Sequence, residues 1–344
     1  MMRAPKKSYN AAPPKTLLIA TFVFGYDYQG YIPFQFYSLY KHYPDYDAIV
    51  YVDRKLRKET LKLLKLIPGY GEKYRVCLVD KIAQTLPRPV MKAYRWLMYD
   101  DVFENYQYVY IGDIDIYICK EDVPLHEQHI LHMTAQKSVF SNIVRAYSEP
   151  PLPKWICKHQ KVLKQLGLFI PITKLHKLYN KFFYHKRITG LHFVNTRDYY
   201  PAIKKQADKF FNVYYKNHII NKIYKLIMKY YASYSDETFL YHLIKKSRLR
   251  LPKQADDKTE ILFCSDMRSH NFRPHHGLHF GMWRDKTKAD ASYHKYMHTP
   301  LCRNYYSQFK NELEQDPILK EIMQNSPKKI QTIIYTMLDD FENC

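Results

Sequence analysis

Apolar and polar positions alternate along the first 120 residues in blocks that predict strands and helices in turn. Short apolar runs, typical of buried strands, lie at 16–24, 48–53, 74–79 and within 106–119. Segments with helical periodicity lie between them at 33–42, 55–66 and 89–103. Strands that alternate with helices of this length favour right-handed crossover connections. We therefore expect an α/β fold in which a mostly parallel sheet is flanked by helices.

The chain changes character after residue 150. Residues 151–230 contain 17 Lys and Arg but 2 Asp and Glu, so this stretch carries most of the net charge of +21. The stretch is also rich in Tyr and Phe, and Pro150, Pro151 and Pro153 mark its beginning. We expect a basic helical insertion here and a helical tail at the C-terminus.

Composition excludes several classes of protein. Hydrophobic residues make up 46% of the 344 residues, which excludes a disordered basic chain, and the 9 glycines exclude a collagen-like one. The apolar run at 17–24 is far shorter than the roughly 20 residues that cross a bilayer.

The six cysteines form no CxxC pair, so we expect reduced thiols and a cytoplasmic protein. No GxGxxG follows the first strand, and no GxxxxGK[ST] is present.

The clearest chemical signal is a pair of aspartates that follows an apolar strand. Asp113 and Asp115 lie two residues apart within 108–118, and strand geometry would place both carboxylates on one face with Ile114 turned away. Two such acids at the carboxyl end of a buried strand suit a hard divalent cation bridged to phosphate oxygens. Another Asp-x-Asp at 45–47 precedes its strand and is expected to be a turn at the other edge.

Several segments in a fixed order resemble the GT-A-fold glycosyltransferases, which use metal-dependent nucleotide-sugar donors. The resemblance covers roughly residues 16–285. Ser235–Leu240 is similar to the His-Asp-Glu-Ser segment of blood-group A/B transferases and to the Asp-Gln segment of glycogenin-type and lipooligosaccharide galactosyltransferases, which retain anomeric configuration. The other similar segments are Thr16–Tyr28, Val52–Asp53, Lys92–Leu97, Gly112–Asp115, Thr189–Thr196 and His276–Trp283.

The resemblance implies a role for each matching residue. Asp113 and Asp115, with His279 or His276, would bind Mn²⁺ or Mg²⁺. Glu237 would act behind the anomeric carbon as nucleophile or electrostatic stabiliser. Asp236 would accept hydrogen bonds from hydroxyls of the donor sugar, and Arg95 would clamp the diphosphate. The remaining donor-binding residues would be Thr21, Phe22, Tyr26, Asp53, Ile114, His192 and Asn195.

The resemblance implies a GT-A-like enzyme that transfers a hexose, with retention, from a UDP-linked sugar to a glycan or glycolipid acceptor. Lys and Arg of the insertion would attract an anionic membrane surface, at roughly 1 kcal/mol each, so we expect a peripheral protein on the inner face of a membrane. No nucleic-acid partner is expected. The expected segments are an extended N-terminus at 1–15, a nucleotide-sugar-binding half at 16–150, a basic insertion with one sugar-lining strand at 151–230, an acceptor and metal-site half at 231–300 and a helical tail at 301–344.

Simpler interpretations remain for parts of this pattern. The acids of Ser235–Leu240 also suit the first turn of a helix, where the helix dipole favours them. The histidines of His275–Trp283 also suit a solvated loop, and the basic stretch also suits amphipathic helices with a solvated face. The alternative function is a basic nucleic-acid-binding protein or a metal-dependent nuclease.

Overall fold

A computed structural model describes residues 14–79, 88–145, 186–216, 236–255, 266–284 and 291–343. The strands are β1 (Lys15–Val23), β2 (Asp47–Val52), β3 (Tyr74–Leu78), β4 (Tyr106–Gly112), β5 (Ile116–Ile118), β6 (Phe140–Ser141), β7 (Val144–Arg145), β8 (Arg187–Ile188), β9 (His192–Asn195) and β10 (Gly277–His279). The helices are α1 (Tyr26–Gln29), α2 (Ile32–His42), α3 (Lys58–Leu64), α5 (Arg88–Tyr94), α6 (Leu125–Gln136), α9 (Thr196–Lys216), α11 (Asp236–Lys246), α12 (Ala291–Met297), α13 (Pro300–Gln315), α14 (Pro317–Asn325) and α15 (Lys328–Glu342), with 3-10 turns η1 (Asp101–Asn105) and η2 (Phe280–Trp283).

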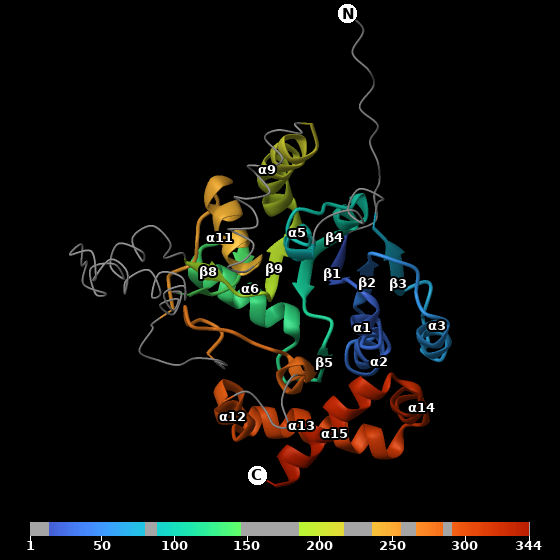
Figure 1. Ribbon diagram of the computed structural model, residues 1–344. Helices are drawn as coiled ribbons and strands as arrows, with labels where there is room; N and C mark the ends of the chain where they lie inside the picture. The colour runs from blue at the N-terminus through green and yellow to red at the C-terminus, as the bar shows by residue number, and fades with distance from the viewer. Residues whose placement is uncertain are drawn as a thin grey trace, which may run out of the picture.

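Six strands form the central sheet in the order β3-β2-β1-β4-β9-β6 (Figure 1). β1 pairs in parallel with β2 and β4, and β2 pairs in parallel with β3, so these four strands end at the same edge. β9 runs antiparallel to β4 and to β6. The mostly parallel, helix-flanked sheet expected for a GT-A-like fold is confirmed. Two short antiparallel ladders, β10–β5 and β7–β8, lie outside this sheet.

The sheet is buried on both faces, which explains the continuous apolar runs of its strands. Leu17 and Ile19 belong to a hydrophobic cluster that includes residues of α2 and of the C-terminal helices. Leu18 and Ala20 point to the other face, into a cluster with residues of α5, α9 and α11. A parallel strand covered on both sides has no polar face, so the strand at 16–24 was predictable from its composition alone.

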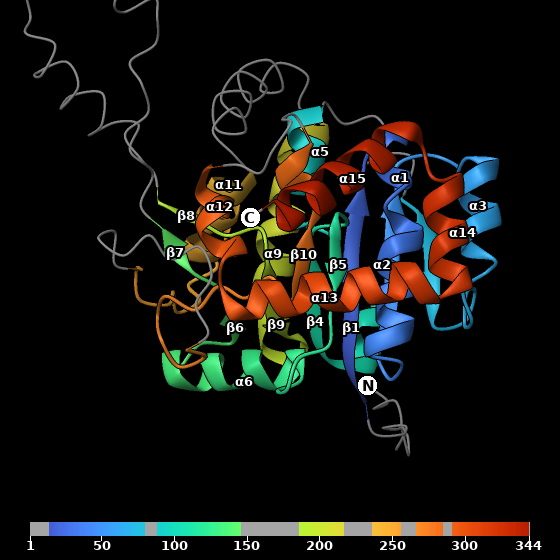
Figure 2. The ribbon, with the colours of Figure 1, turned by 90° about the horizontal axis from the view of Figure 1, so that it is seen from below.

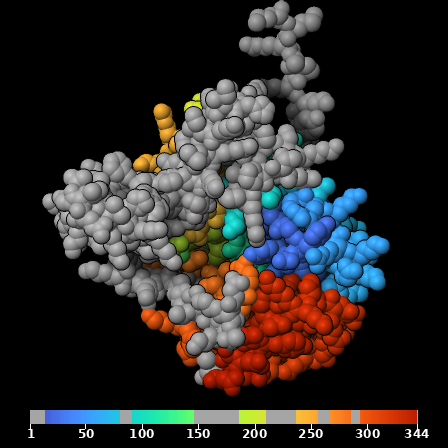
Figure 3. Space-filling model, viewed as in Figure 1, coloured from blue at the N-terminus to red at the C-terminus, as the bar shows by residue number. Residues whose placement is uncertain are grey.

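The C-terminal helices α13–α15 cover the side of the sheet on which α2 lies, and they form the helical tail expected at 301–344. Figure 2 shows α13 and α15 crossing in front of α2 and the strands, and Figure 3 shows the red C-terminal segment packed directly against the blue N-terminal one. The approach is close, since a Cβ built on Gly30 would lie 2.4 Å from Cδ1 of Ile330. The indole of Trp283 donates a hydrogen bond of 2.7 Å to Asp340, which ties η2 to α15.

The helix predicted at 89–103 is shorter than its periodicity suggests. α5 ends at Tyr94, and the chain begins a new 3-10 turn at Asp101. Asp100 fixes the start of this turn, because its carboxylate accepts a hydrogen bond of 3.0 Å from the backbone N–H of Val102 and another of 2.8 Å from the hydroxyl of Tyr51. A side chain that caps a turn in this way favours a separate turn over one continuous helix.

Most of the expected basic insertion lies outside the described residues. Of the stretch 151–230, the structure describes 186–216, which form β8, β9 and α9. Cys77, Cys119 and Cys302 are free thiols, as expected, and the other three cysteines lie outside the described residues. Among the helices that the structure describes, none has the length and apolar character needed to cross a bilayer.

We predict that Gly277→Ala destabilises the protein strongly because β10 approaches β5 too closely for a side chain. A Cβ at Gly277 would lie 1.8 Å from the carbonyl oxygen of Tyr117, and Gly277 has a φ of +154°. Gly71 has a φ of +94° but no atom within 4 Å of its Cβ position, so Gly71→Ala is the matched control. Urea unfolding should show a loss of about 1 kcal/mol for Gly71→Ala and at least about 2 kcal/mol more for Gly277→Ala. Equal losses would contradict the packing described here.

Candidate functional site

Segments far apart in the sequence meet in a cleft of about 340 Å³ at the edge where β1 and β4 end. Open α/β sheets bind ligands at this edge, because the strand ends and the turns that follow them leave backbone and polar side chains accessible there. The cleft is lined by Phe22, Phe24, Tyr28, Lys92, Arg95, Asp113, Ile114, Asp115, Gly190, Asp236, Glu237, His279 and Arg284.

The two aspartates lie in a turn, so the continuous strand predicted at them was wrong, but both carboxylates reach one side as predicted. β4 ends at Gly112, and β5 begins at Ile116 in a separate ladder. The side chain of Gln35 donates a hydrogen bond of 3.2 Å to the carbonyl of Asp113, and the N–H of Phe280 donates one of 2.8 Å to the carbonyl of Asp115. Ile114 is 4% exposed and belongs to the core. The turn is therefore held at both ends and at its centre.

Asp113, Asp115 and His279 form a cluster in which one ligand atom of each lies within 4.8 Å of the others. Nε2 of His279 lies 3.2 Å from Oδ1 of Asp115. Burial opposes protonation of His279, but the nearby Asp115 carboxylate outweighs burial and raises the pKa of the imidazole above its ordinary value. Two carboxylates and one imidazole suit a hard or borderline divalent cation. The residues present therefore fit a metal site.

The structure brings His279 to the aspartates and places His276 elsewhere. Nδ1 of His276 lies 2.8 Å from Oε1 of Glu121, and its Nε2 lies 3.0 Å from Nε2 of His129. His276 is fully buried. His276 directly precedes β10 and His279 is its last residue, so the pairing of this strand with β5 decides which imidazole reaches the cleft.

Two arginines bind the aspartates from different directions. Arg95 donates to Asp113 at 2.7 Å and to Asp236 at 2.5 Å. Nη2 of Arg284 lies 3.6 Å from Oδ2 of Asp115, and the same guanidinium donates to the hydroxyl of Tyr28. Sequence reasoning found Arg95 but missed Arg284, which directly follows the His276–Trp283 segment. Its position at the end of that segment was the one available signal.

The first two residues of α11 face the cleft, each held by an arginine. Oε1 of Glu237 accepts a hydrogen bond of 3.1 Å from the N–H of Gly190, and Arg187 donates to Oε2 at 3.3 Å. Asp236 is bound by Arg95 as described above. Both acids are thus part of the first turn of a helix and of the cleft at once, so the helix start that the Ser235–Leu240 segment predicts is confirmed and is compatible with a role in the cleft. Ser235 itself lies outside the described residues.

Three other predicted donor-binding residues lie at the end of β1 and β2 but do not line the cleft. Thr21 is fully buried opposite Gly112 in the ladder. Asp53 accepts a hydrogen bond of 3.0 Å from the N–H of Gly25 and binds its neighbour Arg54. The remaining residue is Tyr26, whose ring lies 5.0 Å from the guanidinium of Arg54 and 4.8 Å from that of Arg57. Phe22, by contrast, lines the cleft.

The two predicted residues on β9, His192 and Asn195, lie towards opposite edges of the sheet. Because β9 runs antiparallel to β4, its first residues approach the cleft and its last residue lies at the opposite edge. His192 is fully buried behind the cleft and lies 2.9 Å from the side-chain amide of Asn142. Asn195 pairs with Tyr108 near the start of β4, and its side chain accepts a hydrogen bond of 3.2 Å from the N–H of Asp198.

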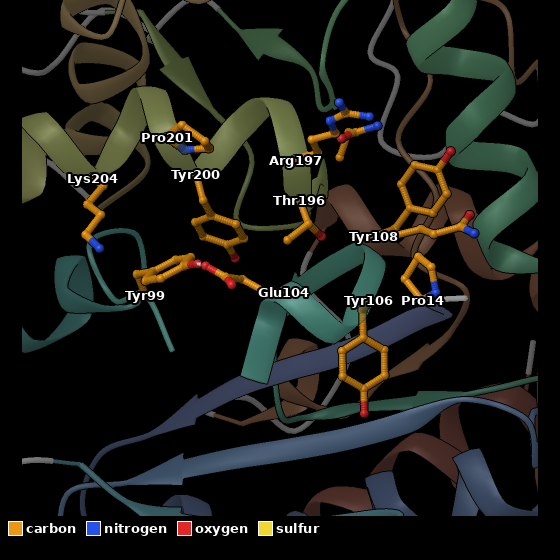
Figure 4. A pocket seen from close by; sticks show the side chains of 12 residues that line it. Pro14, Tyr99, Glu104, Tyr106, Tyr108, Thr196, Arg197, Tyr200, Pro201 and Lys204 are labelled. Atoms are coloured by element: carbon orange, nitrogen blue, oxygen red, sulfur yellow. Dashed lines mark hydrogen bonds between the residues drawn. The ribbon is translucent and has the colours of Figure 1, made fainter. Parts of the chain in front are cut away.

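A larger hollow of about 730 Å³ lies at that opposite edge, beside the starts of β1 and β4. Figure 4 shows Tyr99 and Glu104 facing each other there, with the ring of Tyr200 above them. Asn195 lines this hollow. Although it is larger, it lacks the paired carboxylates and imidazole of the smaller cleft, which therefore remains the candidate site.

Comparison with known proteins finds likeness in the fold only. No family model matches the chain, and no curated protein matches it. Core-mannan synthase A from Aspergillus fumigatus, in its Mn/GDP form, is similar over 60% of this chain and 65% of its own, with 12% identity and a TM-score of 0.38. The mannosyltransferase Ktr4p from S. cerevisiae is similar over 60% of this chain and 63% of its own, with 10% identity and a TM-score of 0.37. The galactosyltransferase LgtC, in complex with donor and acceptor sugar analogs, is similar over 53% of this chain and 59% of its own, with 12% identity and a TM-score of 0.29. The similar region thus spans less than two thirds of each of these chains.

We predict that Asp115→Asn weakens Mn²⁺ binding at least about tenfold, because it removes one of two charged ligands. Titration of the metal-free protein with Mn²⁺, followed by calorimetry, measures the change. Asp45→Asn is the matched control, since Asp45 is exposed in the turn just before β2, whereas Asp47 of the same Asp-x-Asp is buried and begins that strand. Equal affinity of the two variants would show that the cluster of Asp113, Asp115 and His279 does not hold the ion.

We predict that His192→Asn flattens the dependence of stability on pH. Burial, reinforced by repulsion from Arg95, lowers the pKa of His192 to about 3. Between pH 6.5 and 5 the unfolded chain therefore binds a proton that the folded chain does not, and stability falls with decreasing pH by up to about 1.4 kcal/mol per pH unit. Denaturant unfolding at several pH values should give a smaller slope for the variant. An unchanged slope would show that His192 is protonated in the folded protein.

Proposed function

We propose that the protein is a metal-dependent glycosyltransferase that moves a hexose from a nucleotide sugar to a glycan or glycolipid acceptor. The observation that carries this proposal is the convergence of Asp113, Asp115 and His279 in a cleft at the carboxyl edge of the sheet. These three residues would hold Mn²⁺ or Mg²⁺. The cation would supply positive charge to the diphosphate, the leaving group of the reaction.

The cleft offers further positive charge where a diphosphate would lie. Lys92, Arg95 and Arg284 line it together with the two aspartates. Charge builds up on a departing diphosphate, and preorganised cations stabilise that charge more in the transition state than in the bound donor. Arg95 also binds Asp113 and so orients the carboxylate that would ligate the cation. Aromatic side chains of Phe22, Phe24 and Tyr28 line the same cleft and suit the nucleotide base.

Glu237 supports transfer with retention. Its carboxylate lies in the cleft and is fixed by the N–H of Gly190 and by Arg187. A carboxylate held behind the anomeric carbon stabilises the oxocarbenium-like centre that forms as the sugar leaves the diphosphate. Asp236, bound to Arg95, lies next to it and suits the hydroxyls of the donor sugar. We take the donor to be UDP-linked, as the sequence resemblance implies.

Attachment to the inner face of a membrane is part of the proposal and rests on charge alone. The surplus of Lys and Arg in 151–230 would attract anionic lipids. Binding to vesicles that contain phosphatidylserine, compared with neutral vesicles, tests this part independently of catalysis.

We predict that the wild-type protein slowly hydrolyses one nucleotide sugar in the presence of Mn²⁺ and that EDTA abolishes the reaction. A screen of UDP- and GDP-linked sugars by thermal shift identifies the donor, and release of the nucleoside diphosphate measures the rate. Asp115→Asn should lower this rate roughly 100-fold or more, because charge stabilisation of the leaving group is lost. Asp45→Asn should retain it.

The proposed glycosyltransferase function fails if no nucleotide sugar raises the melting temperature of the protein and none is hydrolysed. If the protein then binds DNA with an affinity that survives physiological salt, the nucleic-acid function is the better one.

A further inference from the structure

The hollow at the opposite edge of the sheet is lined by aromatic side chains at its base and by polar ones at its rim. Its volume of about 730 Å³ lies within the range of roughly 300–1,000 Å³ that small-molecule sites occupy. Four tyrosines form the base, of which Tyr106 and Tyr200 are buried and Tyr99 and Tyr108 are half-buried. The two half-buried rings are therefore partly open to a ligand.

These rings are held in place by the core. The ring of Tyr108 stacks on that of Phe193 with centroids 5.0 Å apart. The ring of Tyr99 meets that of Tyr200 edge-on at 5.2 Å, and Tyr200 packs in turn against Phe103 at 5.3 Å. A fixed aromatic surface suits the apolar face of a ligand, because few side chains have to be ordered on binding.

The rim carries planar polar groups of different kinds. They are a carboxylate, two amides and a guanidinium, from Glu104, Gln107, Asn195 and Arg197. The hydroxyl of Tyr99 donates a hydrogen bond to Glu104 and so orients its carboxylate. Each planar group can form two hydrogen bonds at once with neighbouring polar atoms of a ligand. Because Lys204 and Arg197 share the rim with Glu104, both signs of charge are present there, which suits a neutral ligand better than a polyanion.

Two hydroxyls in the lining are buried without a partner. Tyr200 is 3% exposed and Thr196 is 6% exposed, and neither hydroxyl has a hydrogen-bond partner in the part of the chain that the structure describes. In Figure 4 the hydroxyl end of Tyr200 points towards Tyr99 and Glu104. A buried hydroxyl without a partner costs free energy, and a ligand group that forms a hydrogen bond with it recovers that cost.

We propose that this hollow binds a neutral saccharide, a ligand that presents an apolar ring face and several hydroxyls at once. The CH groups of a sugar ring would stack on Tyr99 or Tyr108. Adjacent hydroxyls of the same sugar would bind the planar groups of the rim, among them Glu104 and Gln107. The inference goes beyond the proposed transferase function, because it concerns binding alone and does not need a catalytic cleft.

The hollow lies too far from the cleft to be part of it. β4 begins at the hollow and leads to Asp113 in the cleft, and its seven residues at about 3.3 Å each separate the two by roughly 20 Å. A sugar bound in the hollow is therefore not a sugar that reacts in the cleft. The hollow would hold a glycan at a distance from the metal cluster.

The first measurement titrates the full chain in EDTA, without a nucleotide sugar, with mannotetraose, galactotetraose, maltotetraose and cellotetraose. Calorimetry should show that at least one of them binds the wild-type protein. Glu104→Ala should weaken that binding at least about fivefold, because it removes a charged hydrogen-bond acceptor. Asp101→Ala is the matched control, since Asp101 is an exposed acid of the same 3-10 turn and does not line the hollow. If no tetrasaccharide binds, or if the two variants bind equally, the proposal is overturned.

The second measurement uses the hydroxyl of Tyr200, for which binding and stability should respond differently. Tyr200→Phe should weaken binding about threefold or more but leave the melting temperature unchanged or raise it, because the hydroxyl has no partner among the described residues. Tyr199→Phe is the matched control, since Tyr199 also carries a buried hydroxyl without a described partner but does not line the hollow. Its binding should equal that of the wild type. Weaker binding in both variants, or in neither, would overturn the proposal.

The variant Glu237→Gln separates the hollow from the cleft. A saccharide in the hollow should bind this variant as tightly as it binds the wild type, because Glu237 lies in the cleft. If Glu237→Gln weakens binding and Glu104→Ala does not, the saccharide lies in the cleft, and only the inference about the hollow is overturned. If the hollow binds a saccharide but no nucleotide sugar is hydrolysed, the proposed transferase function fails and the inference stands.

Discussion

The site depends on holding two carboxylates of one turn close together at a buried edge of the sheet. Asp113 and Asp115 repel each other, and the protein opposes that repulsion with Arg95 on one side and Arg284 and His279 on the other. The turn cannot relax because Ile114 is buried in the core between them. A polar backbone at this depth also needs partners, which Gln35 and Phe280 supply. The same turn therefore takes part in the packing of the core, through Ile114, and carries the charges of the site.

The C-terminal helices complete the site although they contribute no residue to it. β10 and η2 carry His279 and lead into Arg284, and both lie against the helical tail. Trp283 bonds to α15, and Gly277 brings β10 against β5 so tightly that a side chain does not fit. These contacts place one imidazole among the aspartates and direct the other, His276, towards Glu121. The helical tail at the end of the sequence thus helps to position β10 and η2 at the cleft.

The balance of charge differs between the two sides of the cleft. On one side, Arg95 and Arg284 face the acids that would ligate a cation. On the other, Glu237 is held by Arg187 and by the backbone N–H of Gly190. The cations that line the cleft are therefore concentrated around the two aspartates, and the carboxylate of Glu237 is fixed in place by Arg187 and a backbone donor.

The strands of the sheet, the order of the helices between them and the pair of aspartates after β4 could be predicted before the fold was known, since local apolar runs and a short-range motif encode these features. The sequence also indicated Arg95, Glu237 and a histidine near residue 276–279 as partners of that pair. The fold was needed to show that Asp113 and Asp115 lie in a turn, that His279 and not His276 reaches them, and that Asn195 lies at the far edge. It alone revealed Arg284 at the cleft and Arg187 beside Glu237. The reason is physical: which side chains meet depends on strand direction, ladder register and the close approach at Gly277, and none of these is a property of neighbouring residues.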